Sequence, residues 1–203
     1  AIIAILAAIL VPAVQKALET AGRARVMSGL HQYGLGMHGY THDHNGILPG
    51  PVFGGQGPNY NNTNAGKRSF AYYLWPYLNG DEPKARTIST IQCLYDGKRE
   101  AKGYPTRYLR NGSVKVGSNE NYDPFGYNTK PRGELGNDDR PSPMDVVPYP
   151  SMTWVMHDTD KESQPGHPGW WDSLPDKAMH GLNIVLFFDA HCETFEKPKT
   201  DLY

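Results

Sequence analysis

Net charge is almost absent from this 203-residue chain, because 20 Lys and Arg stand against 21 Asp and Glu and leave a formal charge of -1. A nucleic-acid-binding surface needs a basic excess, so the balance excludes a polynucleotide partner. Cysteine is scarce as well: Cys93 and Cys192 permit one disulfide bridge if the compartment is oxidising. The sequence does not show whether these two thiols meet.

Motifs of the common enzyme classes are also missing. The chain has no nucleophile elbow, no phosphate-binding loop and no CxxC pair. His38 and His42 have the spacing of a zinc-hydrolase helix, but no glutamate stands between them to act as the base. We therefore expect the protein not to be an enzyme.

The chain does contain a long apolar run, at its beginning. Residues 1–14 read AIIAILAAILVPAV without a charge, whereas the mean hydropathy of the whole chain is -0.59. The run is shorter than the ~20 residues that cross a bilayer, so we expect it to be the remainder of a longer span. Its candidate assembly residues are Ile2, Ile3, Ile5, Leu6, Ile9, Leu10, Pro12 and Val14.

Apolar residues continue at helical spacing beyond this run. Steps of four and three predict a single helix over residues 1–44, with an amphipathic second part. The residues of this stripe are Val26, Leu30, Tyr33, Met37 and Tyr40. Pro12 lacks an amide hydrogen, so a kink or a locally unwound stretch is expected within residues 8–12.

Three glycines of the predicted helix, Gly22, Gly29 and Gly36, stand seven residues apart. This spacing places them near one face of the helix. Two interpretations have equal weight: tight packing within the globule, or close approach of a helix from a neighbouring subunit.

The remainder of the chain, residues 45–203, is rich in Gly, Pro and Asn and predicts a loop-rich globular domain. Ser69 begins a short aromatic helix that stops near Trp75. Residues 96–150 are expected to be irregular. A strand is predicted over 152–156, and a terminal hairpin over 182–188 and 191–195 with its turn at Asp189 and Ala190. The fold class is α+β.

Carboxylates and imidazoles near these strands are candidate metal ligands, namely Asp158, Asp160, His180, Asp189 and His191. Ca²⁺ would take the aspartate oxygens, whereas an ion like Zn²⁺ would prefer the histidines. The alternative is that the same residues cap turns and bind backbone amides. Asn61 and Asn111 begin N-x-S/T triplets in predicted loops and are candidate glycosylation sites.

The segment AIIAILAAILVPAVQKALETAGRARVMSGLHQYGLGMHGYTHDHNGILP resembles the N-terminal helix of type IV pilin-like proteins and type II secretion pseudopilins. It is most similar to the pilin-like family of Planctomycetes and Verrucomicrobia that carries an H-x9-DG signature. The stretch from His180 to His191 is similar to that signature, with eight intervening residues before Asp189 and alanine in place of the glycine. In the family a prepilin peptidase motif, Gly followed by Phe-Thr-Leu-Ile-Glu, stands just upstream of the apolar run, and we expect about ten such residues to precede this chain.

The resemblance implies a type IV pilin-like fold, in which a long N-terminal helix packs on a small antiparallel sheet with extensive loops. It implies a structural subunit that polymerises through its apolar helix into an extracellular pilus-like filament. The implied partners are other copies of the chain, the inner membrane before assembly, the prepilin peptidase and the pilus assembly machinery. Some major pseudopilins hold a calcium near their C-terminal loop, which makes Ca²⁺ the one cofactor that the resemblance suggests.

Two other functions remain open at this point. The protein could be the major pseudopilin of a type II secretion system, which forms a short periplasmic pseudopilus. It could also be a membrane-anchored monomeric binding module.

Overall fold

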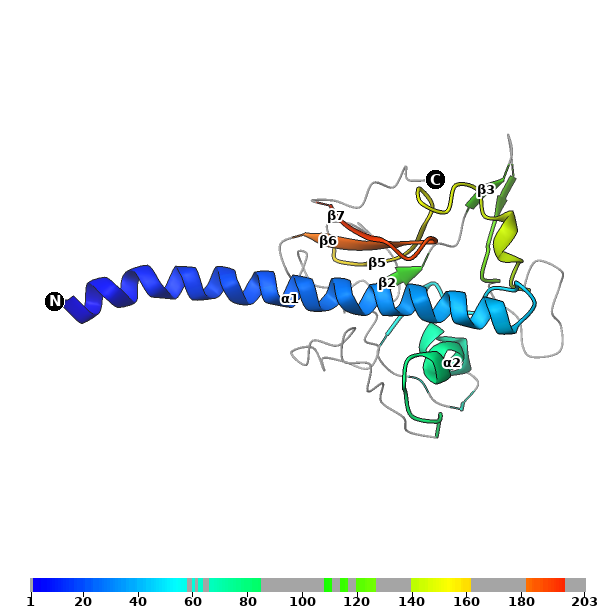
Figure 1. The fold of residues 1–203 in the computed structure, drawn as a ribbon, viewed down its shortest axis with the longest axis horizontal. Coiled ribbons are helices and arrows are strands. Elements are labelled where there is room, and N and C mark those ends of the chain that lie inside the picture. Colours follow the sequence, from blue (N-terminus) through cyan, green and yellow to red (C-terminus); the bar gives the residue numbers. More distant parts are fainter. Residues whose placement is uncertain are drawn as a thin grey trace.

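The computed structural model describes residues 2–57, 60, 62–63, 66–84, 108–110, 114–116, 120–126, 140–161 and 182–195. One long helix, α1 (Ile2–Asp43), dominates the fold (Figure 1). Its second half lies between a small antiparallel sheet on one side and the short helix α2 (Phe70–Leu74) on the other. Its first half extends away from both. The predicted α+β class and the predicted helix over 1–44 are confirmed.

Helix α1 continues through Pro12 without interruption, so of the two predicted alternatives the locally unwound stretch is wrong, and the kink stays a prediction. Ala7, Ala8, Leu10 and Ala13 lie close to Pro12, and the high helix propensity of these residues favours the turn around the missing amide. Burial begins only at Val26 and then follows the predicted stripe through Leu30, Tyr33 and Met37.

The main sheet has five antiparallel strands in the order β1-β2-β5-β6-β7. Their bounds are Gly55–Gln56 for β1, Tyr108–Arg110 for β2, Trp154–Asp158 for β5, Asn183–Phe187 for β6 and Cys192–Phe195 for β7. A separate hairpin pairs β3 (Val114–Val116) with β4 (Glu120–Tyr122). The terminal hairpin is confirmed as β6 and β7. The prediction that residues 96–150 are irregular throughout is wrong, because β2, β3 and β4 lie in this range. Each of these strands has three residues, which is too short for an alternating pattern to reveal it.

Helix α2 begins at the predicted cap, where the Tyr72 amide donates a hydrogen bond of 3.3 Å to Ser69 Oγ. A 3-10 turn, η2 (Trp75–Tyr77), follows it directly. Two further 3-10 turns are η1 (Gly66–Arg68) and η5 (Met144–Val146).

The hydrophobic core lies where α1, α2 and the sheet meet. Phe125 connects its parts, because its ring stacks on Phe188 with centroids 5.5 Å apart and meets Phe70 edge-on at 4.8 Å. The side chains that are almost completely buried around it include Leu30, Met37, Leu48, Leu74, Met156, Ile184 and Leu186. None of these residues precedes Val26, so the first half of α1 contributes nothing to this core.

Candidate functional site: the projecting helix

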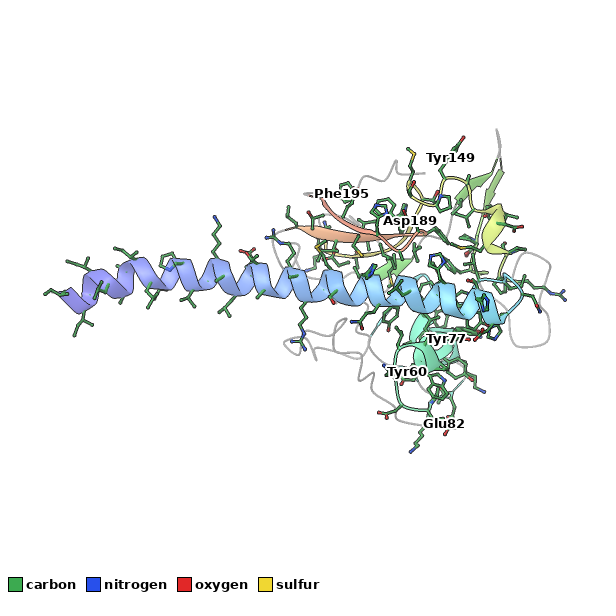
Figure 2. All side chains as sticks on the ribbon, viewed as in Figure 1. Tyr60, Tyr77, Glu82, Tyr149, Asp189 and Phe195 are labelled. Atoms are coloured by element: carbon green, nitrogen blue, oxygen red, sulfur yellow. The ribbon has the colours of Figure 1, made fainter. Side chains whose placement is uncertain are left out.

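The first half of α1 exposes its large apolar side chains to the surroundings on every side (Figure 2). All eight predicted assembly residues lie in this exposed segment. The exposed fractions are 75% for Ile2, 83% for Ile3, 61% for Ile5, 62% for Leu6, 68% for Ile9, 62% for Leu10, 54% for Val11, 45% for Val14 and 67% for Leu18. An 18-residue window of α1 has a mean hydropathy of 1.9 with none of it buried, so the helix is long and apolar enough to cross a membrane.

Exposure on this scale is unfavourable in water. Covering one such side chain is worth ~1.5–3 kcal/mol, so covering the whole segment is worth on the order of 10 kcal/mol or more. Contiguous apolar surface of this kind marks a contact with a membrane or with another protein. The segment is therefore the strongest candidate for a functional surface among the described residues.

Charged residues mark the end of the apolar segment. Lys16 and Glu19 are the first two, and both are exposed. The Thr20 hydroxyl donates a hydrogen bond of 2.9 Å to the Lys16 carbonyl, which keeps that polar side chain satisfied within the helix itself. Beyond Arg25 one face of α1 becomes buried.

The second half of α1 is attached to the globular domain by close backbone contacts. A Cβ added at Gly34 would lie 2.6 Å from the Cβ of Ala190, in the turn between β6 and β7. His31 Nδ1 donates a hydrogen bond of 2.8 Å to the Ala190 carbonyl. A Cβ added at Gly39 would lie 2.8 Å from Tyr77. Gly34 and Gly39 were not predicted from the sequence, because they lie outside the seven-residue spacing of Gly22, Gly29 and Gly36.

The three predicted glycines lie on the side of α1 that faces its own globule. Gly29 and Gly36 are buried and Gly22 is partly so. A Cβ added at Gly36 would meet Leu78 at 3.1 Å within the same chain. For Gly36 the structure therefore supports tight intramolecular packing.

The described candidate metal ligands do not come together. Because β5 and β6 run antiparallel, with Trp154 opposite Phe187, Asp158 and Asp160 lie at one end of the pair and the turn with Asp189 and His191 at the other. Five residues of strand, ~16 Å, separate Ile184, beside Asp158, from Asp189. Among the described residues no group of three or more His, Cys, Asp or Glu could hold a metal ion. These four candidate ligands therefore do not form one metal site, and His180 lies outside the described residues.

The aspartates instead bind backbone amides, as the turn-capping alternative predicts. The Ile184 amide donates to Asp158 Oδ1. The His191 amide donates a hydrogen bond of 3.2 Å to Asp189 Oδ1, and the His191 ring contacts the same oxygen. The contact with the His191 ring holds the pKa of the Asp189 carboxyl below its usual value, against the opposing effect of burial.

Cys192 lies half-buried beside α1, with Sγ 3.7 Å from the Met27 carbonyl oxygen, and burial raises the pKa of its thiol to about 11. Cys93, Asn61 and Asn111 lie outside the described residues, so the disulfide bridge and the glycosylation sites stay predictions.

An aromatic cluster at the far end of α1 was missed by the sequence reasoning. Tyr40 stacks on His44 with ring centroids 3.7 Å apart and meets Tyr73 and Tyr77 edge-on. The Tyr77 hydroxyl donates a hydrogen bond of 2.9 Å to Asp43 Oδ2. The helical period predicted Tyr40 on the buried face, but only the docking of α2 on α1 reveals its partners.

No family model, no curated protein and no solved structure matches this chain.

Proposed function

We propose that this protein is the structural subunit of an extracellular type IV pilus-like filament, which it forms by polymerising through the apolar half of α1. The observation that carries the proposal is the exposure of nine large apolar side chains between Ile2 and Leu18. The same helix continues without a break into the core of the globular domain. The surface that needs covering is thus rigidly attached to the folded part of the subunit.

Two environments would cover this segment in turn. Before assembly it lies in the inner membrane, where a prepilin peptidase and the assembly machinery act on the subunit. After assembly it lies among the same segments of neighbouring subunits. Both environments are apolar, so exclusion of water does not favour one arrangement of the helices over another. Close packing of side chains selects the arrangement instead. Heterologous contacts that do not close then extend the assembly as a filament.

Electron microscopy of negatively stained cells and of the purified protein tests the proposal. Long uniform fibres are expected on the cell surface and in the purified sample. Short periplasmic fibres would instead identify the major pseudopilin of a type II secretion system. Particles that stay single in membranes would identify a monomeric binding module and contradict polymerisation.

Deletion of residues 1–14 provides a matched test within the chain. Because the core begins at Val26, the shortened protein is expected to be soluble and folded but unable to form fibres. Circular dichroism checks the fold, and the same microscopy checks assembly. Fibres of unchanged form from the shortened protein would show that the apolar helix does not drive assembly.

A further inference from the structure

Two histidines near the end of α1, His38 and His42, take no part in the core or in the proposed assembly surface. Helical residues four apart lie on the same face of successive turns, with Cβ atoms ~5–6 Å apart. Each Cα–Cβ bond also tilts toward the N-terminus of the helix, so the His42 side chain starts out toward the turn that carries His38. This spacing lets two imidazoles reach one ion.

The His38 ring is available as a ligand. His38 is partly exposed, and within the part of the chain that the structure describes no hydrogen bond or ion pair engages its ring. Its backbone carbonyl, by contrast, accepts a hydrogen bond of 2.9 Å from the Thr41 hydroxyl. The backbone remains α-helical as far as Asp43, so the two histidines keep their helical spacing.

The His42 ring is oriented by the carboxylate that follows it. Its Nδ1 lies 3.2 Å from Asp43 Oδ1, and the His42 side chain is 89% exposed. The Tyr77 hydroxyl donates a hydrogen bond of 2.9 Å to the other oxygen of Asp43, which ties this carboxylate to a second element. When Nδ1 carries the ring hydrogen and donates it to Asp43, the lone pair of Nε2 is left on the outer side of the ring.

An imidazole held in this way is typical of metal centres. A histidine ligand usually donates its second ring N–H to a carboxylate or a carbonyl, which fixes the tautomer and makes the coordinating nitrogen more basic. Imidazole suits Cu²⁺, Ni²⁺ and Zn²⁺, whereas Ca²⁺ and Mg²⁺ prefer oxygen ligands. Two imidazoles are fewer ligands than a closed protein site has, so water would complete the coordination of the ion.

We propose that His38 and His42 bind one divalent transition-metal ion, Cu²⁺ more tightly than Ni²⁺ or Zn²⁺, and that Asp43 positions His42 for it. The order of the ions is that of the Irving–Williams series. No glutamate stands between the two histidines, so the site holds the ion without the base of a metal-dependent hydrolase.

The site is independent of the apolar half of α1. It lies at the opposite end of the helix from the projecting half (Figure 1), and Figure 2 shows Tyr77 next to this end. Metal binding by single subunits in detergent therefore tests the site whether or not the protein forms fibres.

Calorimetric titration of the full-length protein with CuSO₄ measures the affinity, and electron paramagnetic resonance of the bound Cu²⁺ counts its imidazole nitrogens. The variants are His42→Ala, Asp43→Asn and His38→Gln, in which glutamine retains most of the volume of a partly buried side chain. His44→Ala is the matched control. His44 is also exposed at this end, but its ring stacks on Tyr40 and its Nδ1 lies 2.8 Å from the Tyr40 carbonyl oxygen. Circular dichroism checks that each variant is folded.

Two imidazole nitrogens are expected on the Cu²⁺ bound by the unchanged protein. His42→Ala and His38→Gln should each weaken binding by at least about tenfold and remove one nitrogen, because the second ligand no longer acts at a high effective concentration. Asp43→Asn should weaken binding by about tenfold while both nitrogens remain. His44→Ala should bind Cu²⁺ as the unchanged protein does.

Three results would overturn the site. They are an unchanged affinity in either His38→Gln or His42→Ala, an equal loss of affinity in His44→Ala, and displacement of Cu²⁺ by an excess of Ca²⁺. The last result would show that carboxylate oxygens hold the ion instead of imidazoles. An unchanged affinity in Asp43→Asn would overturn the positioning role of this carboxylate and leave the two histidine ligands in place.

Discussion

At the scale of single residues, the end of β5 has an unusual carboxylate. Asp158 is partly buried at the end of β5, and its Oδ1 accepts a hydrogen bond from the Ile184 amide. Burial, assisted by the charge of Asp160, raises the pKa of this carboxyl to about 7, against the lowering effect of that hydrogen bond. Burial lowers the pKa of the adjacent His157 below its usual value. As the pH rises, Asp158 therefore lowers the free energy of unfolding, whereas His157 raises it.

Asp158 predicts a measurable pH dependence of stability. Its pKa is about 7 in the folded protein and 3.8 in the unfolded chain, so the folded state holds the proton more tightly. The free energy of unfolding therefore falls as the pH rises from 4 to 7, by at most about 4 kcal/mol from this group. Asp158→Asn should remove this slope and keep the amide hydrogen bond.

Chemical denaturation of both proteins between pH 4 and pH 7 measures the difference. Subtracting the two curves cancels the contribution of His157, which runs the other way because its neutral form is favoured in the fold. A difference that stays constant over this pH range would contradict the assignment.

Residue types were easier to predict from the sequence than their positions. Asp158, Asp189 and His191 were identified as polar groups at strand ends, which is where they lie. Whether these residues form one site depends on which ends of β5 and β6 lie next to each other. The antiparallel direction in which the two strands pair decides that question, and a single sequence does not display such long-range pairing.

At the scale of elements, α1 and the terminal hairpin meet at one point of close approach. The turn residue Ala190 has a positive φ of 72° and lies directly against Gly34. Leu186 also lies within 3.1 Å of a Cβ built at this glycine. The close contact between α1 and the terminal hairpin, which are distant in sequence, therefore depends on the absence of a side chain at Gly34.

Gly34→Ala is expected to lower the free energy of unfolding by about 1–3 kcal/mol, although alanine favours the helix itself. The added methyl group overlaps the backbone of Ala190, whose Cα lies 2.8 Å away and has little freedom to move. Gly36→Ala is the matched control, since its nearest neighbour at 3.1 Å is the end of the flexible Leu78 side chain. Denaturation of the full-length proteins in detergent compares them. Equal stability of the two variants would show that the contact at Ala190 does not limit the packing.

Long elements, in which the pattern of apolar residues repeats several times, were predictable from the sequence. Short elements were not. The 42 residues of α1 repeat their helical pattern many times, and the apolar run of β6 is followed by turn residues before β7. By contrast β1 has two residues and β2 has three, so neither repeats the two-residue alternation of a strand often enough to be recognised. Their strand geometry comes from pairing with β5 and with each other.

At the scale of the whole molecule, folding and assembly use different parts of one helix. Leu30 has no exposed surface and lies in the core, whereas Leu6 is 62% exposed in the projecting half. The separation was predictable from composition, because the apolar run of residues 1–14 carries no polar face that could lie against solvent. Which face of the globular half stays bare was not predictable, since it depends on where the sheet and α2 pack.

This separation predicts opposite outcomes for two chemically identical substitutions. Leu30→Ala should lower the free energy of unfolding by about 2–5 kcal/mol, because it leaves a cavity in the core. Leu6→Ala should change it by less than about 0.5 kcal/mol, because that side chain is 62% exposed and lies outside the core. Assembly should respond in the reverse order: fibres of Leu6→Ala should be fewer or less stable to heat, whereas Leu30→Ala that remains folded at low temperature should still form them. Denaturation in detergent and fibre counts in electron micrographs measure the two properties on the same samples. A loss of folding stability in Leu6→Ala would place the projecting half of α1 inside its own subunit, and the case for assembly would then fail.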